Sequence, residues 1–279
     1  IINGGNKLSG EVFVSGSKNA VLPIMAATLI VPGTYKINHV PLLRDTKTMI
    51  RLLEIIGAKI VYSNNTLQID TTQCNNPHAP YNLVKTMRAS FYVLGPLLAR
   101  FHHSKVSLPG GCAWGPRPVD FHIKALREMK VNINLSKGDI IADGQPFGAK
   151  IEFKKKSVGA TGNVLMAASK AKGETIITNA SKEPEIVSLG HFLIKLGAKI
   201  EGLGTERIAI NPIINENNNF EFDIIPDRIE AGTFMIAAAA VGGEIQLKDV
   251  NPSHLDSVIS NLNKLKISIK MGNNNIFIS

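Results

Sequence analysis

The chain has few of the residues on which several kinds of protein depend. Its 279 residues include only two cysteines, Cys74 and Cys112, and one tryptophan, and aromatic residues make up 6% of the sequence. Two cysteines cannot build a disulfide framework, and alone they cannot complete a zinc site. Sparse aromatic residues disfavour a surface that binds nucleic acid by base stacking. The composition favours an α/β protein of a reducing, cytoplasmic compartment.

Long hydrophobic runs are also missing. The apolar stretches 20–32 and 231–243 are shorter than the roughly 20 residues that a helix needs to span a bilayer. No secretory signal is visible at the start of the chain. We therefore expect these stretches to form buried helices, and we expect no membrane partner. The sequence begins with isoleucine rather than methionine, so we expect its start to have been trimmed.

Acidic residues are outnumbered by basic ones. The chain has 31 lysines and arginines against 22 aspartates and glutamates, a formal charge of +9. A basic balance attracts nucleic acid, anionic lipid or phosphorylated metabolites. The positive residues are scattered apart from the run 154–156, so nucleic acid is the weakest of these interpretations. Charge alone leaves open whether the chain has anionic substrates or only a solvated basic surface.

A repeat organises the sequence. Four segments share an extended stretch, a short polar or glycine-containing turn and an apolar helix of small residues, and they start near Glu11, Tyr81, Ala149 and Phe220, at a spacing of about 70 residues. Each is followed by a strand with alternating β-branched residues, an amphipathic helix and a short strand pair. The helices before Gly57 and Gly197 end on "GAKI", which is typical of a C-cap glycine. The sequence thus predicts four β-α-β-α-β-β units.

The distinctive polar residues of each unit lie at the turn that opens its first helix. Ser17, Ser157 and Asp227 are common N-cap residues, so capping alone explains any one of these turns. Helix N-termini also carry free N–H groups and partial positive charge, which favour anions. Because Lys18 and Arg88 lie at equivalent turns, we expect several turns to meet in one cleft and to bind a multiply charged anion.

Six motifs resemble those of a known family. The motifs are "GSKNA", "TMRAS", "GGCAWGPRPVD", "KKSVGAT", "KEPEIV" and "PDRIEAGTF". In this order they resemble the enolpyruvyl transferases along the whole chain. The block around Cys112 resembles the members that act on UDP-N-acetylglucosamine rather than on shikimate 3-phosphate, whose enzymes lack this cysteine block.

The resemblance implies a two-domain, inside-out α/β barrel in which each domain contains three units. With four units here, we expect the second domain to be incomplete and the family's C-terminal third, with its aspartate base, to be absent. The family's N-terminal strand crosses to the other domain. This implies a three-unit domain at 15–223 that carries the cysteine loop, and a truncated second domain made of 1–14 and 224–279.

The resemblance also implies a reaction, in which the enolpyruvyl group of phosphoenolpyruvate moves to the 3′-hydroxyl of UDP-N-acetylglucosamine and phosphate is released. This is the first committed step of peptidoglycan biosynthesis, and it requires no metal and no organic cofactor. Cys112 is expected to act as general acid and to form an adduct with phosphoenolpyruvate. Lys18 and Arg117 are expected to hold phosphoenolpyruvate and to lower the pKa of the Cys112 thiol.

Further residues match the family's substrate-binding positions. Asn19 is expected to hydrogen-bond the sugar nucleotide, and Arg88 to contact substrate anions. The resemblance places the uridine against Pro118, Val119, Asp120 and His122, the diphosphate near Lys155, Ser157, Val158 and Gly159, and Asp227 on the opposite wall. Arg228 and Glu230 are either structural partners of each other or part of the site, and the sequence leaves both open. No motif surrounds Cys74, which we expect to be structural.

Two other functions remain open. An incomplete second domain would leave a non-catalytic module that binds the nucleotide sugar. The sister reaction of the family, transfer to shikimate 3-phosphate, shares the same fold.

Overall fold

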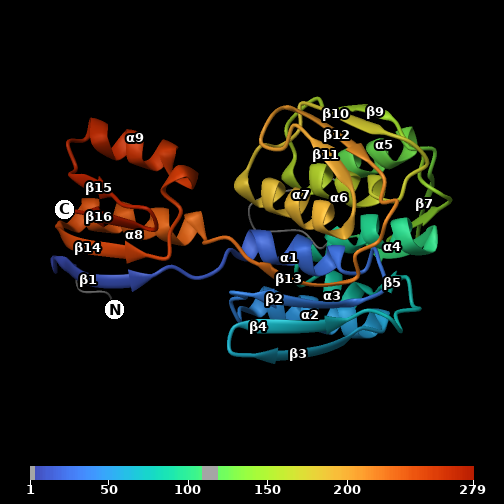
Figure 1. Cartoon of the computed structure of the whole chain (residues 1–279), viewed down its shortest axis with the longest axis horizontal. Coiled ribbons are helices and arrows are strands. Elements are labelled where there is room, and N and C mark those ends of the chain that lie inside the picture. The colour runs from blue at the N-terminus through green and yellow to red at the C-terminus, as the bar shows by residue number, and fades with distance from the viewer. Residues whose placement is uncertain (1–3, 109–118) are drawn as a thin grey trace.

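The structure, a computed structural model, describes residues 4–108 and 119–279 (Figure 1). Unit one comprises β1 (Leu8–Phe13), α1 (Lys18–Ala27), β2 (Thr34–Asn38), α2 (Arg44–Ile56), β3 (Lys59–Ser63) and β4 (Thr66–Asp70). Unit three comprises β9 (Lys150–Glu152), α6 (Val158–Ala168), β10 (Thr175–Thr178), α7 (Pro184–Leu196), β11 (Lys199–Glu201) and β12 (Arg207–Asn211). Both units follow the predicted order, and both C-cap glycines adopt the left-handed conformation.

The fourth unit repeats this order with one addition. It comprises β13 (Asn219–Asp223), α8 (Arg228–Val241), β14 (Gly243–Lys248), the 3₁₀ turn η2 (Pro252–His254), α9 (Asp256–Lys264), β15 (Ile269–Met271) and β16 (Asn275–Ile278). The predicted α/β class and the repeated unit are therefore confirmed.

Unit two departs from the prediction in its first half. It comprises β5 (His78–Ala79), α3 (Tyr81–Val84), the 3₁₀ helix η1 (Arg88–Val93), α4 (Leu94–Phe101), β6 (His103–Ser107), α5 (Asp120–Glu128), β7 (Asn132–Ser136) and β8 (Asp139–Asp143). The segment from Tyr81 was expected to be extended, which is wrong. Pro96 lacks an N–H, and its ring would collide with the carbonyl of Tyr92 in a continuous α-helix. The first helix is accordingly divided just before Pro96.

Residues 4–108 and 119–279 form four sheets of four strands each, and two of these sheets exchange their first strand. The strands of unit two form one sheet, in the order β5-β6-β8-β7, and the strands of unit three form another, in the order β9-β10-β12-β11. By contrast, β1 of unit one pairs in parallel with β14 of unit four, from Leu8 opposite Gly243 to Phe13 opposite Lys248. In return, β13 of unit four pairs in parallel with β2 of unit one. Units one and four are thus linked by a reciprocal exchange.

The two segments that make this exchange run side by side. Ser17 N donates to Ile225 O at 2.8 Å, and Asp227 N donates to Ser15 O at 2.8 Å. Figure 1 shows both segments passing between the sheet that contains β1 and β14 and the rest of the protein. This short antiparallel contact fixes the start of α1 against the start of α8.

The buried apolar side chains form two clusters. The larger cluster extends from Ala20 to Ile224 and draws on units one to three. The smaller cluster contains Val14 and buried residues between Ala231 and Ile278. Each cluster has its own sheet or sheets, so the chain builds two cores joined by the exchanged segments.

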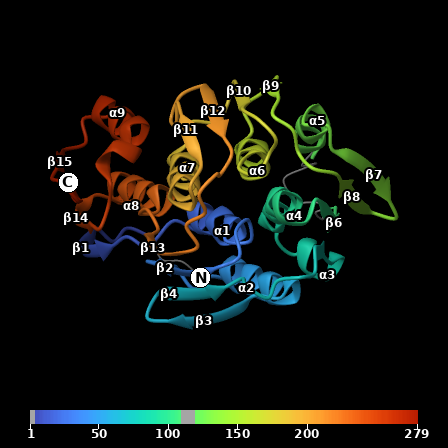
Figure 2. The ribbon, with the colours of Figure 1, turned by 45° about the vertical axis from the view of Figure 1, so that its right-hand side comes forward.

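The helices lie inside and the sheets outside in the larger part (Figure 2). Within α1 every residue from Ala20 to Ala27 is buried, and within α6 every residue from Ala160 to Ala168 is buried. Small side chains allow this close approach of helices. The equivalent helix α8 has a similar composition, yet its Ile229 and Ile236 are 50% and 56% exposed. The first helix of a unit is therefore fully buried only where other units surround it.

Length and hydropathy argue against membrane-spanning helices among the described residues. No helix there is long and apolar enough to cross a bilayer.

Gly95 permits the contact between α4 and α6. A Cβ at this position would lie 2.4 Å from the carbonyl oxygen of Asn163, far inside van der Waals contact. The backbone of α6 cannot retreat, because it is buried on every side. Glycine is therefore required here for packing.

We predict that Gly95→Ala lowers the free energy of unfolding by at least about 2 kcal/mol, since overpacking against a rigid backbone typically costs 1–3 kcal/mol. The matched control is Gly232→Ala in α8, where the new Cβ would meet Val258 Cγ2 at 3.5 Å, an ordinary contact. The control should be neutral or stabilising by up to about 1 kcal/mol. Urea unfolding followed by circular dichroism measures both, and equal stabilities would contradict the packing argument.

Candidate functional site

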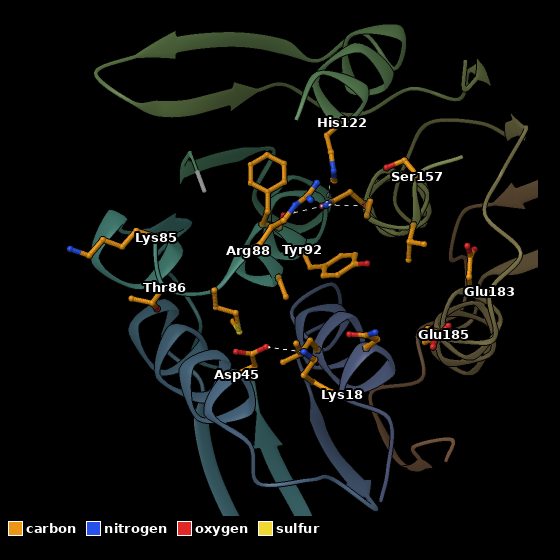
Figure 3. Close-up of a pocket in the computed structure, with 18 of the residues that line it drawn as sticks. Lys18, Asp45, Lys85, Thr86, Arg88, Tyr92, His122, Ser157, Glu183 and Glu185 are labelled. Carbon is orange, nitrogen blue, oxygen red and sulfur yellow. Dashed lines mark hydrogen bonds and ion pairs between the residues drawn. The ribbon is translucent and has the colours of Figure 1, made fainter. Parts of the chain in front are cut away.

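A pocket of about 640 Å³ opens where the first helices of units one, two and three begin (Figure 3). Its lining comes from α1, α2, η1 and the turn before it, α5, α6 and α7, with Arg228 of α8 at one side. The polar and charged lining residues are Lys18, Asn19, Asp45, Lys85, Thr86, Arg88, Tyr92, His122, Ser157, Asn163, Glu183, Glu185 and Arg228. Of the residues predicted to bind substrate, the structure brings seven together here: Lys18, Asn19, Arg88, His122, Ser157, Val158 and Gly159.

The start of α1 provides the first wall. Ser17 caps the helix, with its hydroxyl accepting from Ala20 N at 3.3 Å, as the sequence predicted. Lys18 and Asn19 follow in the first turn and reach the pocket. The ammonium of Lys18 lies 3.4 Å from Asp45 Oδ2, and both side chains are partly exposed. An exposed pair of this kind is weak, so an incoming anion can compete for Lys18.

The start of α6 provides the opposite wall. Ser157 caps this helix in the same way, accepting from Ala160 N at 3.3 Å. The N–H groups of Val158 and Gly159 lie in the first turn and have no acceptor within the helix. They add partial positive charge, which favours the binding of an anion at this end of the pocket. Capping and anion binding are compatible at this turn, because the cap uses a different N–H.

Unit two supplies Arg88 and His122. Arg88 is the first residue of η1, after the extended Met87. His122 lies in the first turn of α5, 4% exposed, with its ring edge-on to Phe91 at 4.9 Å. Burial, with a smaller contribution from the charge of Arg88, lowers the pKa of His122 to about 3. The imidazole is therefore uncharged at neutral pH.

Four predicted residues lie outside this pocket. Val119 is the residue before α5, and Asp120 begins that helix and lines a separate hollow of about 220 Å³ beside Phe153. Lys155 is exposed. Asp227 caps α8 and accepts from the backbone N–H of Lys18 at 3.2 Å, so it lies next to the pocket without lining it.

The remaining predicted residues, Cys112, Arg117 and Pro118, lie outside the described residues.

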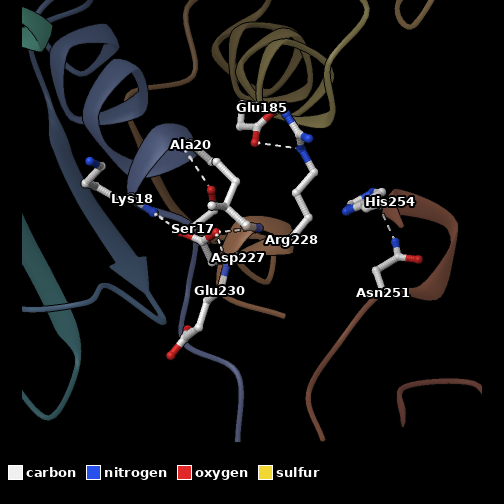
Figure 4. A network of polar contacts seen from close by, with 10 residues as sticks. Ser17, Lys18, Ala20, Glu185, Asp227, Arg228, Glu230, Asn251 and His254 are labelled. Carbon is white, nitrogen blue, oxygen red and sulfur yellow. Dashed lines mark hydrogen bonds and ion pairs between the residues drawn. The ribbon is translucent and has the colours of Figure 1, made fainter. Parts of the chain in front are cut away.

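Glu185, which the sequence analysis missed, forms an ion pair at the pocket with Arg228, one of the two residues that the sequence left open (Figure 4). Arg228 Nε and Nη2 donate to the two carboxylate oxygens of Glu185 at 3.0 and 3.3 Å. The Glu185 side chain is 4% exposed and that of Arg228 is 32% exposed, so the carboxylate is desolvated while the guanidinium keeps some access to water. Glu230 instead accepts from Ser15 N at 2.8 Å. The suggestion that Arg228 and Glu230 pair with each other is therefore wrong.

Tyr92 and Glu183 complete the acidic side of the pocket. Burial, and then the charge of Glu185, raises the pKa of Tyr92, so the phenol stays protonated. Glu183 precedes α7 and has a buried Oε2 with no hydrogen-bond partner among the described residues. The "KEPEIV" motif contains both glutamates, but the sequence gives no sign of what they contact.

Cys74 is structural, as the sequence predicted. It is buried at 5% exposure, and burial raises the pKa of its thiol to about 11. Its carbonyl accepts from the guanidinium of Arg100 at 3.0 Å. A thiol of this kind stays protonated and unreactive.

The pocket thus combines lysine, arginine and the N-termini of α1 and α6 on opposite walls with several carboxylates. The chemistry of such a set suits a phosphorylated ligand that also carries hydroxyl groups. No group of three or more histidine, cysteine or acidic side chains in residues 4–108 and 119–279 is placed to hold a metal ion.

Comparison with known families agrees with this fold. The model of the EPSP synthase (3-phosphoshikimate 1-carboxyvinyltransferase) family matches residues 2–279. The chain therefore belongs to this family of enolpyruvyl transferases, and the resemblance inferred from its motifs is confirmed.

Individual relatives are similar over most of this chain. A UDP-N-acetylglucosamine 1-carboxyvinyltransferase of Geotalea uraniireducens is 50% identical over 270 residues, which are 96% of this chain and 64% of the relative. An enzyme of the same name from Chloroherpeton thalassium is 52% identical over 269 residues, 95% of this chain and 62% of the relative. The chain spans a little under two thirds of the length of these curated relatives.

Solved structures share the fold at low identity. The enolpyruvyl transferase NikO from Streptomyces tendae superposes with a TM-score of 0.84 at 20% identity, covering 99% of this chain and 67% of that one. EPSP synthase from Acinetobacter baumannii gives a TM-score of 0.77 at 19% identity, covering 100% of this chain and 66% of that one. At these identities the likeness shows the fold alone.

We predict that Arg228→Met lowers the free energy of unfolding by about 3 kcal/mol, because it leaves the buried Glu185 carboxylate without its counter-ion. The double variant Arg228→Met/Glu185→Met should be more stable than Arg228→Met alone, since it removes both charges. Lys36→Met is the control, because it breaks an exposed pair with Glu221 and should change little. Urea unfolding measures all three. A double variant less stable than Arg228→Met would contradict this account of the pair.

Proposed function

We propose that the chain serves the transfer of the enolpyruvyl group of phosphoenolpyruvate to the 3′-hydroxyl of UDP-N-acetylglucosamine, with release of phosphate, in peptidoglycan biosynthesis. Relatives at about 50% identity carry the name of this activity. The observation that carries the proposal is the meeting of Lys18, Asn19, Arg88 and the α6 N-terminus in one pocket. Both substrates are anions, and this set of groups binds anions.

The chemistry requires an addition followed by an elimination. In the addition, a base takes the proton of the sugar hydroxyl, its oxygen bonds to C2 of phosphoenolpyruvate, and the C2=C3 double bond is consumed as C3 takes up a proton. In the elimination, a base takes a proton from C3, the double bond re-forms, and the bond between C2 and the phosphate oxygen breaks, so that phosphate leaves. We assign proton delivery to Cys112, and the grip on phosphoenolpyruvate to Lys18 and Arg117 as a point charge and a bidentate fork. Cations around phosphate and carboxylate stabilise the charge that moves in both steps.

The sugar nucleotide is assigned to the other residues of the site. Asn19 would hydrogen-bond the sugar, and Arg88 would contact an anionic group. The uridine would lie against Pro118, Val119, Asp120 and His122, and the diphosphate against Lys155, Ser157, Val158 and Gly159. Asp227 would face the sugar from the opposite wall. The presence of His122, Ser157, Val158 and Gly159 together in the lining of the pocket supports this assignment.

We also assign residues 15–223 to one domain, and 1–14 with 224–279 to a second. The division of the buried side chains into two clusters supports this boundary. The pairing of β1 with β14 and of β13 with β2 supports the crossing of the N-terminal strand.

The test measures binding by calorimetry and phosphate release with phosphoenolpyruvate, for UDP-N-acetylglucosamine and for shikimate 3-phosphate. We expect binding and phosphate release with the sugar nucleotide only. Lys18→Ala should lower kcat/KM about 10- to 100-fold, because a hydrogen bond to a charged group is worth about 1.5–3 kcal/mol. Lys199→Ala, at an exposed position of β11, is the control and should leave it unchanged. Cys112→Ala should abolish turnover.

The other outcomes separate the alternatives. Binding of the sugar nucleotide without phosphate release would identify a non-catalytic binding module. Phosphate release with shikimate 3-phosphate would identify the sister reaction. Neither binding nor release with either acceptor would contradict the proposal.

A further inference from the structure

Asn163 lies at the centre of a fully buried hydrogen-bond network behind the pocket. It belongs to the middle of α6 and has 0% exposure. Its carboxamide contacts three segments of unit two: the start of α4 at Gly95, the η1 backbone at Phe91, and the ring of His122 in α5. An asparagine in a helix interior is unfavourable for helix formation, so this position is held by its tertiary partners.

The network determines which way the carboxamide faces. Gly95 N–H can only donate, and it lies 2.8 Å from Asn163 Oδ1. The carbonyl of Phe91 can only accept, and it lies 3.2 Å from Asn163 Nδ2. Rotating the amide by 180° would place donor against donor and acceptor against acceptor in a buried site. The orientation with Oδ1 toward Gly95 is therefore required.

This orientation in turn determines the tautomer of His122. Asn163 Nδ2 lies 3.1 Å from Nδ1 of His122 and 3.5 Å from the carbonyl oxygen of Gly159 in its own helix, and the shorter contact takes its second hydrogen. A ring nitrogen that accepts a hydrogen bond carries no proton, so the proton of the neutral imidazole is on Nε2. His122 is thus an N–H donor at its outer nitrogen.

The outer nitrogen of His122 faces the first turn of α6. A Cβ at Gly159 would lie 3.2 Å from both Cε1 and Nε2 of His122, so only glycine leaves room for the ring at this place. No described residue accepts a hydrogen bond from Nε2, although the side chain is more than nine-tenths buried. Figure 3 shows His122 extending from α5 toward the pocket. The donor therefore lies beside the first turn of α6, where the N–H groups of Val158 and Gly159 have no acceptor within the helix.

Burial is the main reason why the ring stays neutral. Burial lowers the pKa of His122 to about 3, and Arg88 acts in the same direction. The other charged groups that line the same pocket are Lys18, Asp45, Lys85, Glu183, Glu185 and Arg228. None of these carboxylates contacts the ring, so nothing among the described residues opposes the effect of burial.

We propose that Asn163 is a positioning residue, which holds His122 in the Nε2–H tautomer so that an uncharged donor points at an acceptor oxygen of the bound nucleotide diphosphate. The proposal rests on the proposed function for the identity of the ligand. The tautomer itself follows from the protein alone. Because the donor is uncharged, it can orient a bound anion through a directional hydrogen bond without adding a positive charge that would repel Arg88.

The tautomer is tested first, on the ligand-free chain. Nitrogen-15 NMR of the histidine side chains distinguishes a protonated from an unprotonated ring nitrogen, and comparison with His122→Gln assigns the signals. We expect Nε2–H for His122 in the wild type, unchanged from pH 8 to pH 5. Asn163→Asp keeps the acceptor for Gly95 N–H but removes the donor to Nδ1. In this variant we expect the proton to move to Nδ1 and the ring to titrate at higher pH.

Binding of UDP, measured by calorimetry, tests the role of the donor. Asn163→Asp should weaken UDP binding about tenfold at pH 8, as expected for one lost hydrogen bond to a charged group. The loss should diminish at low pH, where the carboxylate allows His122 to carry both protons. His122→Gln, whose amide N–H can replace Nε2–H, should retain most of the affinity. Adding Asn163→Asp to His122→Gln should then change the affinity little.

The outcomes separate this proposal from the proposed function. A wild-type His122 protonated on Nδ1, or an Asn163→Asp spectrum identical to wild type, would overturn the positioning role. Equal loss of UDP affinity from Asn163→Asp in the wild-type and His122→Gln backgrounds would reduce Asn163 to a structural role. A wild type that has the Nε2–H tautomer but does not bind UDP would overturn the donor role and the proposed function, and would leave only the tautomer assignment standing.

Discussion

The burial of α1 and α6 on all sides is the constraint on which the site depends. A helix without a solvent-facing side can expose charged residues to solvent only at its ends. Lys18 and Asn19 therefore lie in the first turn of α1, and Ser157 caps α6. The close contact at Gly95 brings α4 against α6, so these ends meet at one place. The pocket is a consequence of helix packing and requires no special loop among the described residues.

The strand exchange adds a second constraint, because it joins the two cores at the edge of this pocket. The segments next to Gly16 and Pro226 pair in antiparallel fashion. This contact aligns the start of α8 with the start of α1, so that Asp227 accepts from the Lys18 N–H. It also brings Arg228 to Glu185 of α7. Movement of the smaller core relative to the larger core would thus directly displace residues at the edge of the pocket.

Sequence periodicity predicted most of this fold, because each unit repeats the same alternation of strand and helix. It failed around Tyr81, where Pro96 and the tight contact with α6 divide the helix of unit two. The N-caps at Ser17, Ser157 and Asp227 were predictable, since capping depends on residues three apart in the sequence. The motif residues on α1, η1 and α6 were correctly expected to converge.

The sequence could not predict the contacts between units. The pair Arg228–Glu185 depends on the strand exchange, and the contact of Asn163 with His122 joins residues 41 apart through the packing of α6 on α5. A buried asparagine within the apolar stretch "VGATGNVLMAA" was the one available sign of the second network. Polar residues in fully apolar helices are retained only where they have partners.

The central claim is that the helix N-termini of three units form the binding site for a sugar nucleotide. Its most direct test is a crystal structure of the chain with UDP-N-acetylglucosamine. We expect diphosphate oxygens within hydrogen-bond distance of the Val158 and Gly159 N–H groups and of His122 Nε2, with the sugar toward Lys18 and Asn19. A nucleotide bound away from the first turn of α6, or a pocket that stays empty at saturating ligand, would contradict the account.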